Sequence, residues 1–331
     1  MRIVIIASRI AHRKWLRKYG TAIGFLGVVL LFWALKPTTF MTLPNWLNIT
    51  QQVSILCVVA FTMTAVMVVG DFDLSVGTMA SLVGITAASL MKSGQPIPVA
   101  ISVALLVGVL GGVVNGLLVA YAKLPPFIAT LGTLTAFGGL ALYISGGNTI
   151  YGRAIPQAFG QFGRNGIPLG SIDGRAVNLP NLTILSATVF AAVWFTLEKT
   201  VFGRRLYAIG SNAEASRLVG IRVRMLKLLA FAISGLGAAI AGLMLTSRLA
   251  SANPTQGDGL MLNAIAAVFL GMTMSEQGEP HVLGTLLGVL ILGVLANGLT
   301  QLQINTYIQQ ILTGSIIITA VLTGSLSRRR S

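Results

Sequence analysis

Residues 97–121 contain no charged side chain over a length that can cross the hydrocarbon core of a bilayer. The surface of a soluble domain needs charged residues, and this chain has few. Of its 331 residues, 54% are apolar and only 9% are charged. Long apolar runs occupy residues 20–36, 50–69, 74–91, 97–121, 126–145, 181–198, 227–247, 260–274, 281–300 and 306–324. The sequence therefore predicts an all-α polytopic membrane protein with about ten transmembrane helices.

The basic excess of the chain follows this predicted membrane topology. Lys and Arg number 23 against 8 Asp and Glu, a balance that in a soluble protein would suggest nucleic-acid binding. With ten spans both termini share one side, and that side holds 17 of the 23 basic residues. Because loops rich in Lys and Arg stay in the cytoplasm, both termini are predicted to be cytoplasmic, and no nucleic-acid partner is expected.

The predicted spans divide the chain into a membrane domain and two short basic ends. Residues 1–19 form a cytoplasmic N-terminal segment, residues 20–324 the membrane domain, and residues 325–331 a cytoplasmic tail. The outer loop, residues 146–180, is rich in Gly and Pro, and its stretch GRNGIPLGSIDGR is expected to be exposed and non-helical. The inner loop, residues 199–226, is basic and carries helix signals.

The two halves of the chain share a short motif. Asn115-Gly-Leu recurs as Asn297-Gly-Leu 182 positions later, and Gly132 and Gly314 each stand 17 residues after the respective Asn. An odd number of spans separates the copies, so the second would run in the opposite sense, as in the inverted repeats of many transporters. Chance similarity between glycine-rich apolar helices is the alternative.

Glycines recur every fourth residue beside each copy of this motif. Small residues at this spacing let helices approach closely, so we expect these positions to pack against neighbouring helices rather than to bind a ligand. They are Gly108, Gly112, Gly116, Gly284 and Gly288. Asn115 and Asn297, beside these faces, are better candidates for lining a polar path.

A short helix is predicted within the inner loop. Ser211 and Glu214 fit a capping box, in which the Ser hydroxyl accepts a free amide of the first turn and the Glu carboxylate reaches back to the cap amide. Gly220 stands where such a helix would stop, so helix is expected over about residues 212–219. A positively charged inner loop that is merely ordered is the alternative to a functional role.

Two carboxylates lie between the second and third apolar runs. A charged group at mid-bilayer costs about 3 kcal/mol, so Asp71 and Asp73 must meet water or protein partners. Asp73 either caps the third helix or takes part in a substrate path. Thr130 and Thr133 add hydroxyl groups to the fifth run, although threonine in membrane helices often bonds its own backbone.

The sequence lacks the signatures of several kinds of chemistry. No Lys follows a Gly, so the chain has no phosphate-binding G-x-x-x-x-G-K motif and cannot hold ATP in that way. The two histidines, His12 and His281, are far apart, and the single cysteine, Cys57, lies in an apolar run. Neither a metal site nor enzymatic activity is expected.

Several segments resemble the membrane subunits of ribose-type sugar ABC importers, a family that includes ribose, xylose, arabinose and galactoside systems. They are GDFDLSVG at 70–77, KLPPFIATLGTLTAFGGLAL at 123–142, TVFGRRLYAIGSNAEASRLVGI at 200–221 and SRLASANPTQGDG at 247–259. Within the third segment, EASRLVG resembles the EAA-x-x-x-G loop through which such permeases dock on their ATPase, with Ser216 in place of the second Ala. The resemblance covers residues 45–324 and departs after Gly271, where MTMSEQGEPHVLGT replaces a glycine-rich stretch.

The resemblance implies a permease subunit, embedded in the lipid of the cytoplasmic (inner) membrane, that moves a small neutral sugar or polyol. It also implies three partners: an ABC ATPase that uses ATP and Mg, an external solute-binding protein, and a second permease copy in a homo- or heterodimer. No cofactor is expected on this chain. The resemblance assigns ATPase coupling to an inner-loop set consisting of Gly203, Arg204, Ser211, Asn212, Glu214, Ala215, Ser216 and Gly220.

Polar residues in and beside the spans, together with the aromatic residue Phe127, form a candidate substrate path. It consists of Asp73, Asn115, Phe127, Thr130, Thr133, Asn263 and Asn297. The amide and hydroxyl groups in this set can exchange hydrogen bonds with a polyol but cannot neutralise an ion, which predicts a neutral sugar-like cargo.

The most polar outward-facing stretches form a candidate docking surface for the binding protein. This surface combines the outer loop with Arg153, Arg248, Asn253 and Asp258. The main alternative function for the chain is ion-coupled secondary transport of a small polar solute, because secondary transporters also use inverted repeats. A channel is a third possible function.

Overall fold

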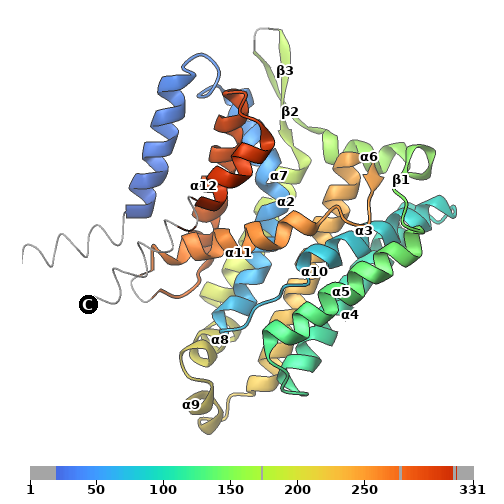
Figure 1. Cartoon of the computed structure of the whole chain (residues 1–331), viewed down its shortest axis with the longest axis vertical. Helices are drawn as coiled ribbons and strands as arrows, with labels where there is room; N and C mark the ends of the chain where they lie inside the picture. Colours follow the sequence, from blue (N-terminus) through green and yellow to red (C-terminus); the bar gives the residue numbers. More distant parts are fainter. Residues whose placement is uncertain (1–19, 173, 276–277, 316–317, 319–331) are drawn as a thin grey trace, which may run out of the picture. The chain divides into compact units, whose positions relative to one another are not determined.

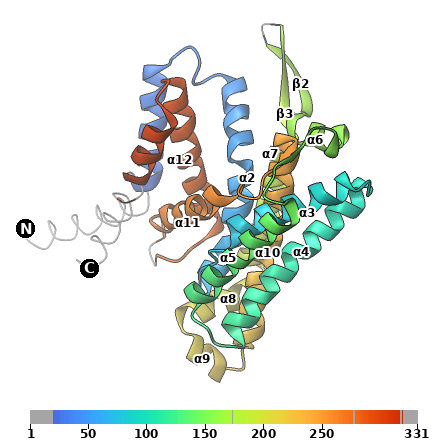
Figure 2. The ribbon, with the colours of Figure 1, turned by 45° about the vertical axis from the view of Figure 1, so that its right-hand side comes forward.

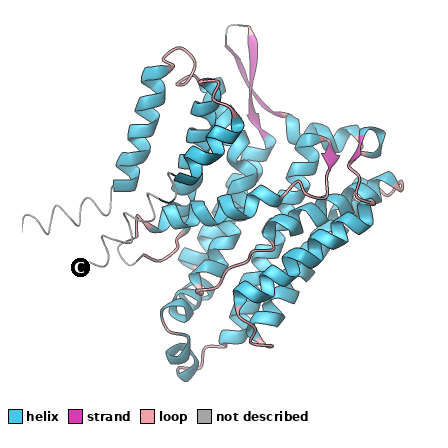
Figure 3. Cartoon of the chain, viewed as in Figure 1, coloured by secondary structure: helices cyan, strands magenta, loops and turns pink. Residues whose placement is uncertain are grey.

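The computed structural model describes residues 20–172, 174–275, 278–315 and 318, and most of these residues are helical (Figure 3). The two predicted cytoplasmic ends, residues 1–19 and 325–331, lie outside the described residues, as does His12.

Six described helices are long and apolar enough to cross a membrane. They are α2 (Leu43–Val68), α4 (Ile97–Ala120), α5 (Pro126–Ser145), α7 (Asn181–Trp194) with its π-helical extension η2 (Phe195–Lys199), α10 (Val223–Leu249) and α12 (Val282–Gln301). Shorter apolar helices cover Gly20–Leu35, α3 (Val76–Lys92) and α11 (Asp258–Met272), and residues 306–315 are helical as well. All of these helices lie on predicted apolar runs, which confirms a helical membrane protein.

The start of α2 differs from its prediction. The helix begins at Leu43, whereas the apolar run was placed from residue 50 onward. The hydroxyl of Thr42 accepts the Asn45 amide at 3.4 Å, and Pro44 occupies the first turn, where its missing N–H costs nothing. Local capping therefore extends α2 beyond its apolar stretch.

Short elements occupy the loops and the end of α10. They are β1 (Ile150–Tyr151), η1 (Gly152–Ala154), α6 (Gln157–Arg164), β2 (Gly166–Ile172), β3 (Arg175–Pro180), α8 (Val201–Ser211), α9 (Ala213–Leu218) and β4 (Ser251–Ala252). β2 and β3 form an antiparallel hairpin, and β1 pairs antiparallel with β4 (Figure 1). The stretch GRNGIPLGSIDGR is non-helical from residue 165 on, as predicted, but it enters a regular hairpin. The short helix α6 was not predicted.

The chain divides into two compact units. One consists of residues 1–53 and 265–331, and the other of residues 54–264, so the divisions fall within α2 and α11. In the following, the former is the first unit and the latter is the second.

Glycines bring α4 and α10 together in the second unit. A Cβ added at Gly112 would lie 2.3 Å from the Phe231 carbonyl oxygen, and one at Gly108 would lie 2.4 Å from the Ala239 Cβ. Gly116 packs equally closely on Leu228. The helix α5 runs beside α4 (Figure 2). The predicted packing role of these glycines is therefore confirmed.

Glycines also bring α11 and α12 together in the first unit. A Cβ added at Gly288 would lie 2.0 Å from the Ala267 carbonyl oxygen, and one added at Gly284 would lie 2.6 Å from the Gly271 carbonyl oxygen. Farther along α12, Gly298 lies against the ring of Phe32. Both copies of the Asn-Gly-Leu motif thus lie on helices that pack through glycine.

Candidate functional site

The Asp73 carboxylate lies at the centre of a buried hydrogen-bonded cluster in the second unit. One of its oxygens accepts the Ser75 amide at 3.0 Å and the Ser75 hydroxyl at 2.7 Å. The other oxygen accepts the hydroxyl of Ser234, on α10, at 2.8 Å. Asp73 is only 1% exposed, so these bonds replace water around its charge. The backbone amide that Asp73 accepts belongs to Ser75, the N-cap residue of α3, so Asp73 satisfies a free amide at the start of this helix although it is not the N-cap itself.

Asn115 and Thr133 extend this cluster to α4 and α5. The Asn115 amide donates to the Ser75 hydroxyl at 2.8 Å and to Asp73 at 3.3 Å. Its side-chain oxygen accepts the Thr133 hydroxyl at 2.6 Å. The four residues Asp73, Asn115, Thr133 and Ser234 therefore join the start of α3 to three long helices through one network.

The remaining candidates for the substrate path are placed differently. Thr130 is buried beside the cluster and donates to the Pro126 carbonyl at 2.7 Å. Phe127, 59% exposed, and Asn263, also exposed, do not take part in the cluster. Asn297 belongs to the first unit, where its buried side chain accepts a hydrogen bond from Gln301 at 3.1 Å. The structure thus brings together Asp73, Asn115, Thr130 and Thr133 from the predicted set.

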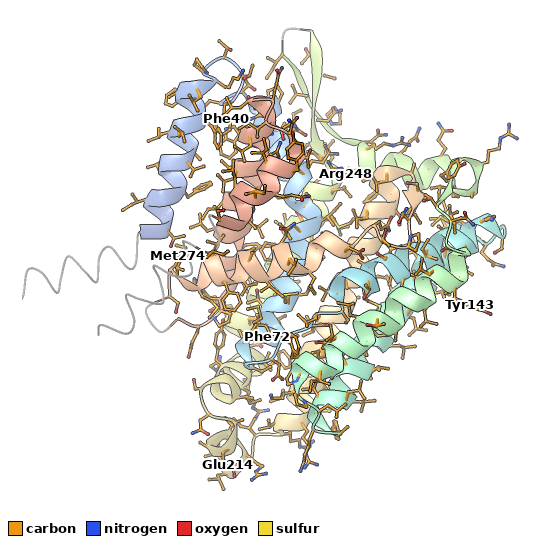
Figure 4. All side chains as sticks on the ribbon, viewed as in Figure 1. Phe40, Phe72, Tyr143, Glu214, Arg248 and Met274 are labelled. Carbon is orange, nitrogen blue, oxygen red and sulfur yellow. The ribbon has the colours of Figure 1, made fainter. Side chains whose placement is uncertain are left out.

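The inner loop contains two consecutive short helices, α8 and α9. The predicted capping box at Ser211 is wrong, because α8 continues through Ser211. Asn212 has an extended backbone, and its side-chain oxygen accepts the Ala215 amide at 2.9 Å, so Asn212 is the N-cap of α9. Glu214 consequently falls one position too early for the box and forms an exposed ion pair with Arg217 at 2.5 Å (Figure 4).

The end of α9 agrees with the prediction. Gly220 adopts φ +84°, its amide bonds the Arg217 carbonyl at 3.1 Å, and the Ile221 amide bonds Ser216 at 3.0 Å. This bond pair is a Schellman motif, which favours glycine at the left-handed position.

The predicted coupling residues lie on and beside these two helices, and they differ in how far their side chains are exposed to solvent. Gly203 is buried, and a Cβ there would lie 1.9 Å from the Leu197 carbonyl oxygen. Ser216 is buried, whereas Arg204, Asn212, Glu214 and Ala215 are exposed. Leu218 and Val219, which follow Ser216 and the exposed Arg217 at the end of α9, are 80% and 78% exposed. This apolar pair was not noticed in the sequence.

The outer candidate residues meet around the β1–β4 ladder. Ile150 pairs with Ala252, and the Asn253 amide donates to the Thr149 hydroxyl at 2.8 Å. Arg153 follows β1 and is exposed, whereas Arg248, near the end of α10, is half-buried beside α6 (Figure 4). Asp258 is the first residue of α11. The ladder therefore brings the Arg153 and Asn253 segments together.

Comparison with known proteins identifies the family. The chain matches the family model described as branched-chain amino acid transport system / permease component over residues 45–321. Ribose import permease protein RbsC of Bacillus subtilis (strain 168) is 42% identical over 324 residues, 98% of this chain and 97% of that protein. The chain belongs to this permease family.

Further relatives of the permease are also matched along most of their length. D-allose transport system permease protein AlsC of Escherichia coli (strain K12) is 35% identical over 305 residues, 92% of this chain and 90% of that protein. Probable ABC transporter permease protein YphD of the same strain is 34% identical over 325 residues, 97% of this chain and 95% of that protein. No solved structure matches the permease. It is a multi-pass membrane protein and a transport component rather than an enzyme.

The permease contains an ion pair, Asp71–Lys227, that was not predicted from the sequence. The Lys227 ammonium group contacts both carboxylate oxygens of Asp71, at 2.8 and 2.9 Å. The side chains are 20% and 6% exposed, respectively. Asp71 was expected to need a partner, but 156 residues separate it from Lys227 and no local pattern joins them. Among the described residues, no group of three His, Cys, Asp or Glu side chains could hold a metal ion.

Proposed function

We propose that the permease is the membrane subunit of an ATP-driven importer whose cargo is a small neutral sugar or polyol. The observation that carries the proposal is the near full-length match to the ribose import permease of Bacillus subtilis. The D-allose permease supports the same cargo class. Because the description of the family model names branched-chain amino acids, the choice of a sugar needs a physical argument as well.

The electrostatics of the second unit favour a neutral cargo. The carboxylates of Asp71 and Asp73 already bind Lys227 and the hydroxyl groups of Ser75 and Ser234. A zwitterionic or phosphorylated solute beside them would lose hydration without gaining a counter-ion, at a cost of several kcal/mol. A polyol loses less, and hydrogen bonds of about 1 kcal/mol each would let it leave again.

The same contacts disfavour an ion-coupled secondary transporter. That class uses ionisable groups within the membrane to bind and release the driving ion. In this permease Asp71 forms an ion pair with Lys227, and both carboxylate oxygens of Asp73 accept hydrogen bonds. Neither carboxylate is therefore open to a driving ion.

We infer that α8 and α9 dock on a separate ABC ATPase, which binds ATP and Mg. Leu218 and Val219 are almost fully exposed beside basic residues, and an apolar tip of this kind is stabilised when a partner covers it. Gly203, Arg204, Ser211, Asn212, Glu214, Ala215, Ser216 and Gly220 form the rest of the proposed coupling segment. The excess of Lys and Arg in the loops supports a cytoplasmic location for this surface and for both termini.

The assembly proposed around this permease has four further features. Residues 20–324 form the membrane domain, with about ten spans in the inner membrane. A second permease copy, identical or not, completes the path. The substrate path includes Asp73, Asn115, Phe127, Thr130, Thr133, Asn263 and Asn297. An external solute-binding protein docks on the outer loop with Arg153, Arg248, Asn253 and Asp258.

Competition for uptake tests the cargo class. The permease, its ATPase and its binding protein are reconstituted in proteoliposomes, and labelled ribose uptake is measured against unlabelled ribose, allose, leucine and ribose 5-phosphate. Competition by a neutral sugar or polyol is expected. Stronger competition by leucine or ribose 5-phosphate than by the neutral sugars would overturn the proposed cargo.

A further inference from the structure

A short loop between α2 and α3 forms several side-chain contacts in the second unit. We call residues 70–75 the junction loop. Gly70 adopts φ +82°, its amide bonds the Met67 carbonyl at 3.0 Å, and the Asp71 amide bonds Val66 at 3.2 Å. These bonds end α2 with a Schellman motif. The chain then continues without regular secondary structure until α3 begins at Val76.

The two carboxylates of the junction loop both contact α10. Asp71 binds Lys227, and Asp73 accepts the hydroxyl of Ser234. Lys227 and Ser234 are seven residues apart, which is two turns and about 10 Å along one face of a helix. The junction loop therefore lies along the first part of α10 and is attached to it at two points.

The inner loop contacts the same region from both of its ends. At the end of α8, a Cβ on Gly210 would lie 1.9 Å from the Val68 carbonyl oxygen, so α8 packs directly on the last turn of α2. On the other side of α9, the chain enters α10 at Val223 and reaches Lys227 one turn later. The segment between Gly210 and Lys227, which contains α9, thus lies between one contact with the end of α2 and one with the junction loop.

We propose that the Asp71–Lys227 ion pair is a positioning pair that transmits movement of the coupling helices α8 and α9 to the helices of the membrane path. The proposal rests on the function proposed above, in which these helices dock on an ATPase. Displacement of α9 pulls on the start of α10, and Lys227 carries the displacement to the junction loop. Asp73, two residues farther on, passes it through Asn115 and Thr133 to α4 and α5.

A largely buried ion pair is better suited to fixing the relative position of two elements than to stabilising the fold. A largely buried pair gains little net stability, because desolvation of the two charges offsets their attraction. It does fix the register of the two elements that it joins, and here it joins the helix that follows α9 to the junction loop at a second point, besides the Asp73–Ser234 hydrogen bond. Coupling between distant sites needs such a contiguous chain of contacts with defined positions.

The test separates positioning from folding by removing both charges together. The double variant Asp71→Leu/Lys227→Met leaves no unpaired charge and keeps side-chain volume, so it should assemble with the ATPase as the wild type does. The charge-swapped variant Asp71→Lys/Lys227→Asp restores an ion pair. Lys123→Met is the matched control, since it removes an exposed lysine from a turn on the same predicted side of the membrane. In reconstituted complexes, the ATP hydrolysed per sugar imported is measured for each.

A merely structural role would lower ATP hydrolysis and import in parallel, and their ratio would stay constant. The positioning role predicts that the ratio rises on the order of tenfold in the apolar double variant, the size of effect expected for a lost charged hydrogen bond. The ratio should return toward the wild-type value in the charge-swapped variant and stay unchanged in Lys123→Met. A wild-type ratio in the apolar double variant would overturn the positioning pair.

Two other outcomes are also decisive. If the apolar double variant is not recovered from membranes, Asp71→Asn is measured in its place, with the same rise expected and a wild-type ratio again overturning the proposal. If the wild-type complex itself imports sugar without consuming ATP, the proposed function fails, and the positioning pair fails with it.

Discussion

The hydroxyl of Thr133 on α5 donates a 2.6 Å hydrogen bond to the side-chain oxygen of Asn115 on α4. Asn115 uses its amide group at the same time to donate to Ser75 and Asp73. A single asparagine side chain therefore connects two helices to the buried carboxylate before α3. Three candidates for the polar path, Asp73, Asn115 and Thr133, therefore also link α3, α4 and α5 within the second unit.

Replacing Asn115 should therefore destabilise the permease. Asn115→Leu removes the donor to Asp73 and the acceptor for Thr133, although both residues keep other hydrogen-bond partners. Each buried hydrogen bond lost costs about 0.5–1.5 kcal/mol, and one to a charged group about 1.5–3 kcal/mol. We expect a clear drop in the thermal unfolding temperature of the purified protein. Asn263→Leu is the control, because Asn263 is exposed and should change the unfolding temperature little. An unchanged unfolding temperature for Asn115→Leu, with an altered sugar preference, would instead assign Asn115 to the path alone.

Close packing of α4 on α10 predicts opposite effects for two glycine substitutions. Gly112→Ala places a Cβ 2.3 Å from the Phe231 carbonyl oxygen, so the helices must separate, at a cost of about 1–3 kcal/mol. Gly132→Ala meets nothing within 4 Å and replaces glycine by a better helix former, which should stabilise α5 by up to about 1 kcal/mol. Unfolding temperatures in detergent measure both. Equal effects of the two substitutions would contradict the packing described here.

The cap of α9 can be located by mutation. Asn212→Ala removes the acceptor for the Ala215 amide, which costs about 1 kcal/mol and should fray this six-residue helix without affecting membrane insertion. Stimulation of the partner ATPase by the loaded binding protein should fall. Asn212→Ser should restore it, because serine is an equally good cap.

Ser211→Ala provides the comparison for this test. Ser211 is the last residue of α8, whereas Asn212 is the N-cap of α9, so the loss of Ser211 should reduce ATPase stimulation less than the loss of Asn212. A larger effect of Ser211→Ala than of Asn212→Ala would return the cap to the position predicted from the capping box.

Docking of the binding protein should depend on charge at the outer loop. Arg153 is exposed directly after β1, so Arg153→Glu reverses a charge on the proposed docking surface. The affinity of the loaded binding protein for the reconstituted permease should fall, and the difference from the wild type should shrink at high salt. Lys123→Glu reverses an exposed charge on the opposite predicted side and serves as the control. Equal affinities for wild type and Arg153→Glu at low salt would remove Arg153 from this surface.

The helices were predictable because hydrophobic runs of membrane length leave few alternatives. The predicted run 126–145 coincides with α5, where Pro125 and Pro126 mark the start and Gly146 the end. Local capping was harder to predict. The Ser211 box matched the sequence pattern, but the pattern does not reveal that α8 occupies Ser211, which leaves Asn212 as the first residue with an extended backbone.

The hairpin of β2 and β3 had a local signal that was overlooked. Its strands end at Ile172 and begin again at Arg175, and the sequence between them is Asp-Gly, which favours two-residue hairpin turns. The Asp71–Lys227 pair had no comparable signal. Its partners lie 156 residues apart, and only the folded second unit brings them together.

The central claim, ATP-driven import, is tested most directly by the energy source of uptake. Proteoliposomes containing the permease, its ATPase and its binding protein are loaded with ATP and Mg, and accumulation of labelled ribose is followed without any ion gradient. The account predicts accumulation that requires ATP hydrolysis and that disappears when the ATPase is omitted. Accumulation driven by a proton or sodium gradient, with no ATPase present, would contradict it.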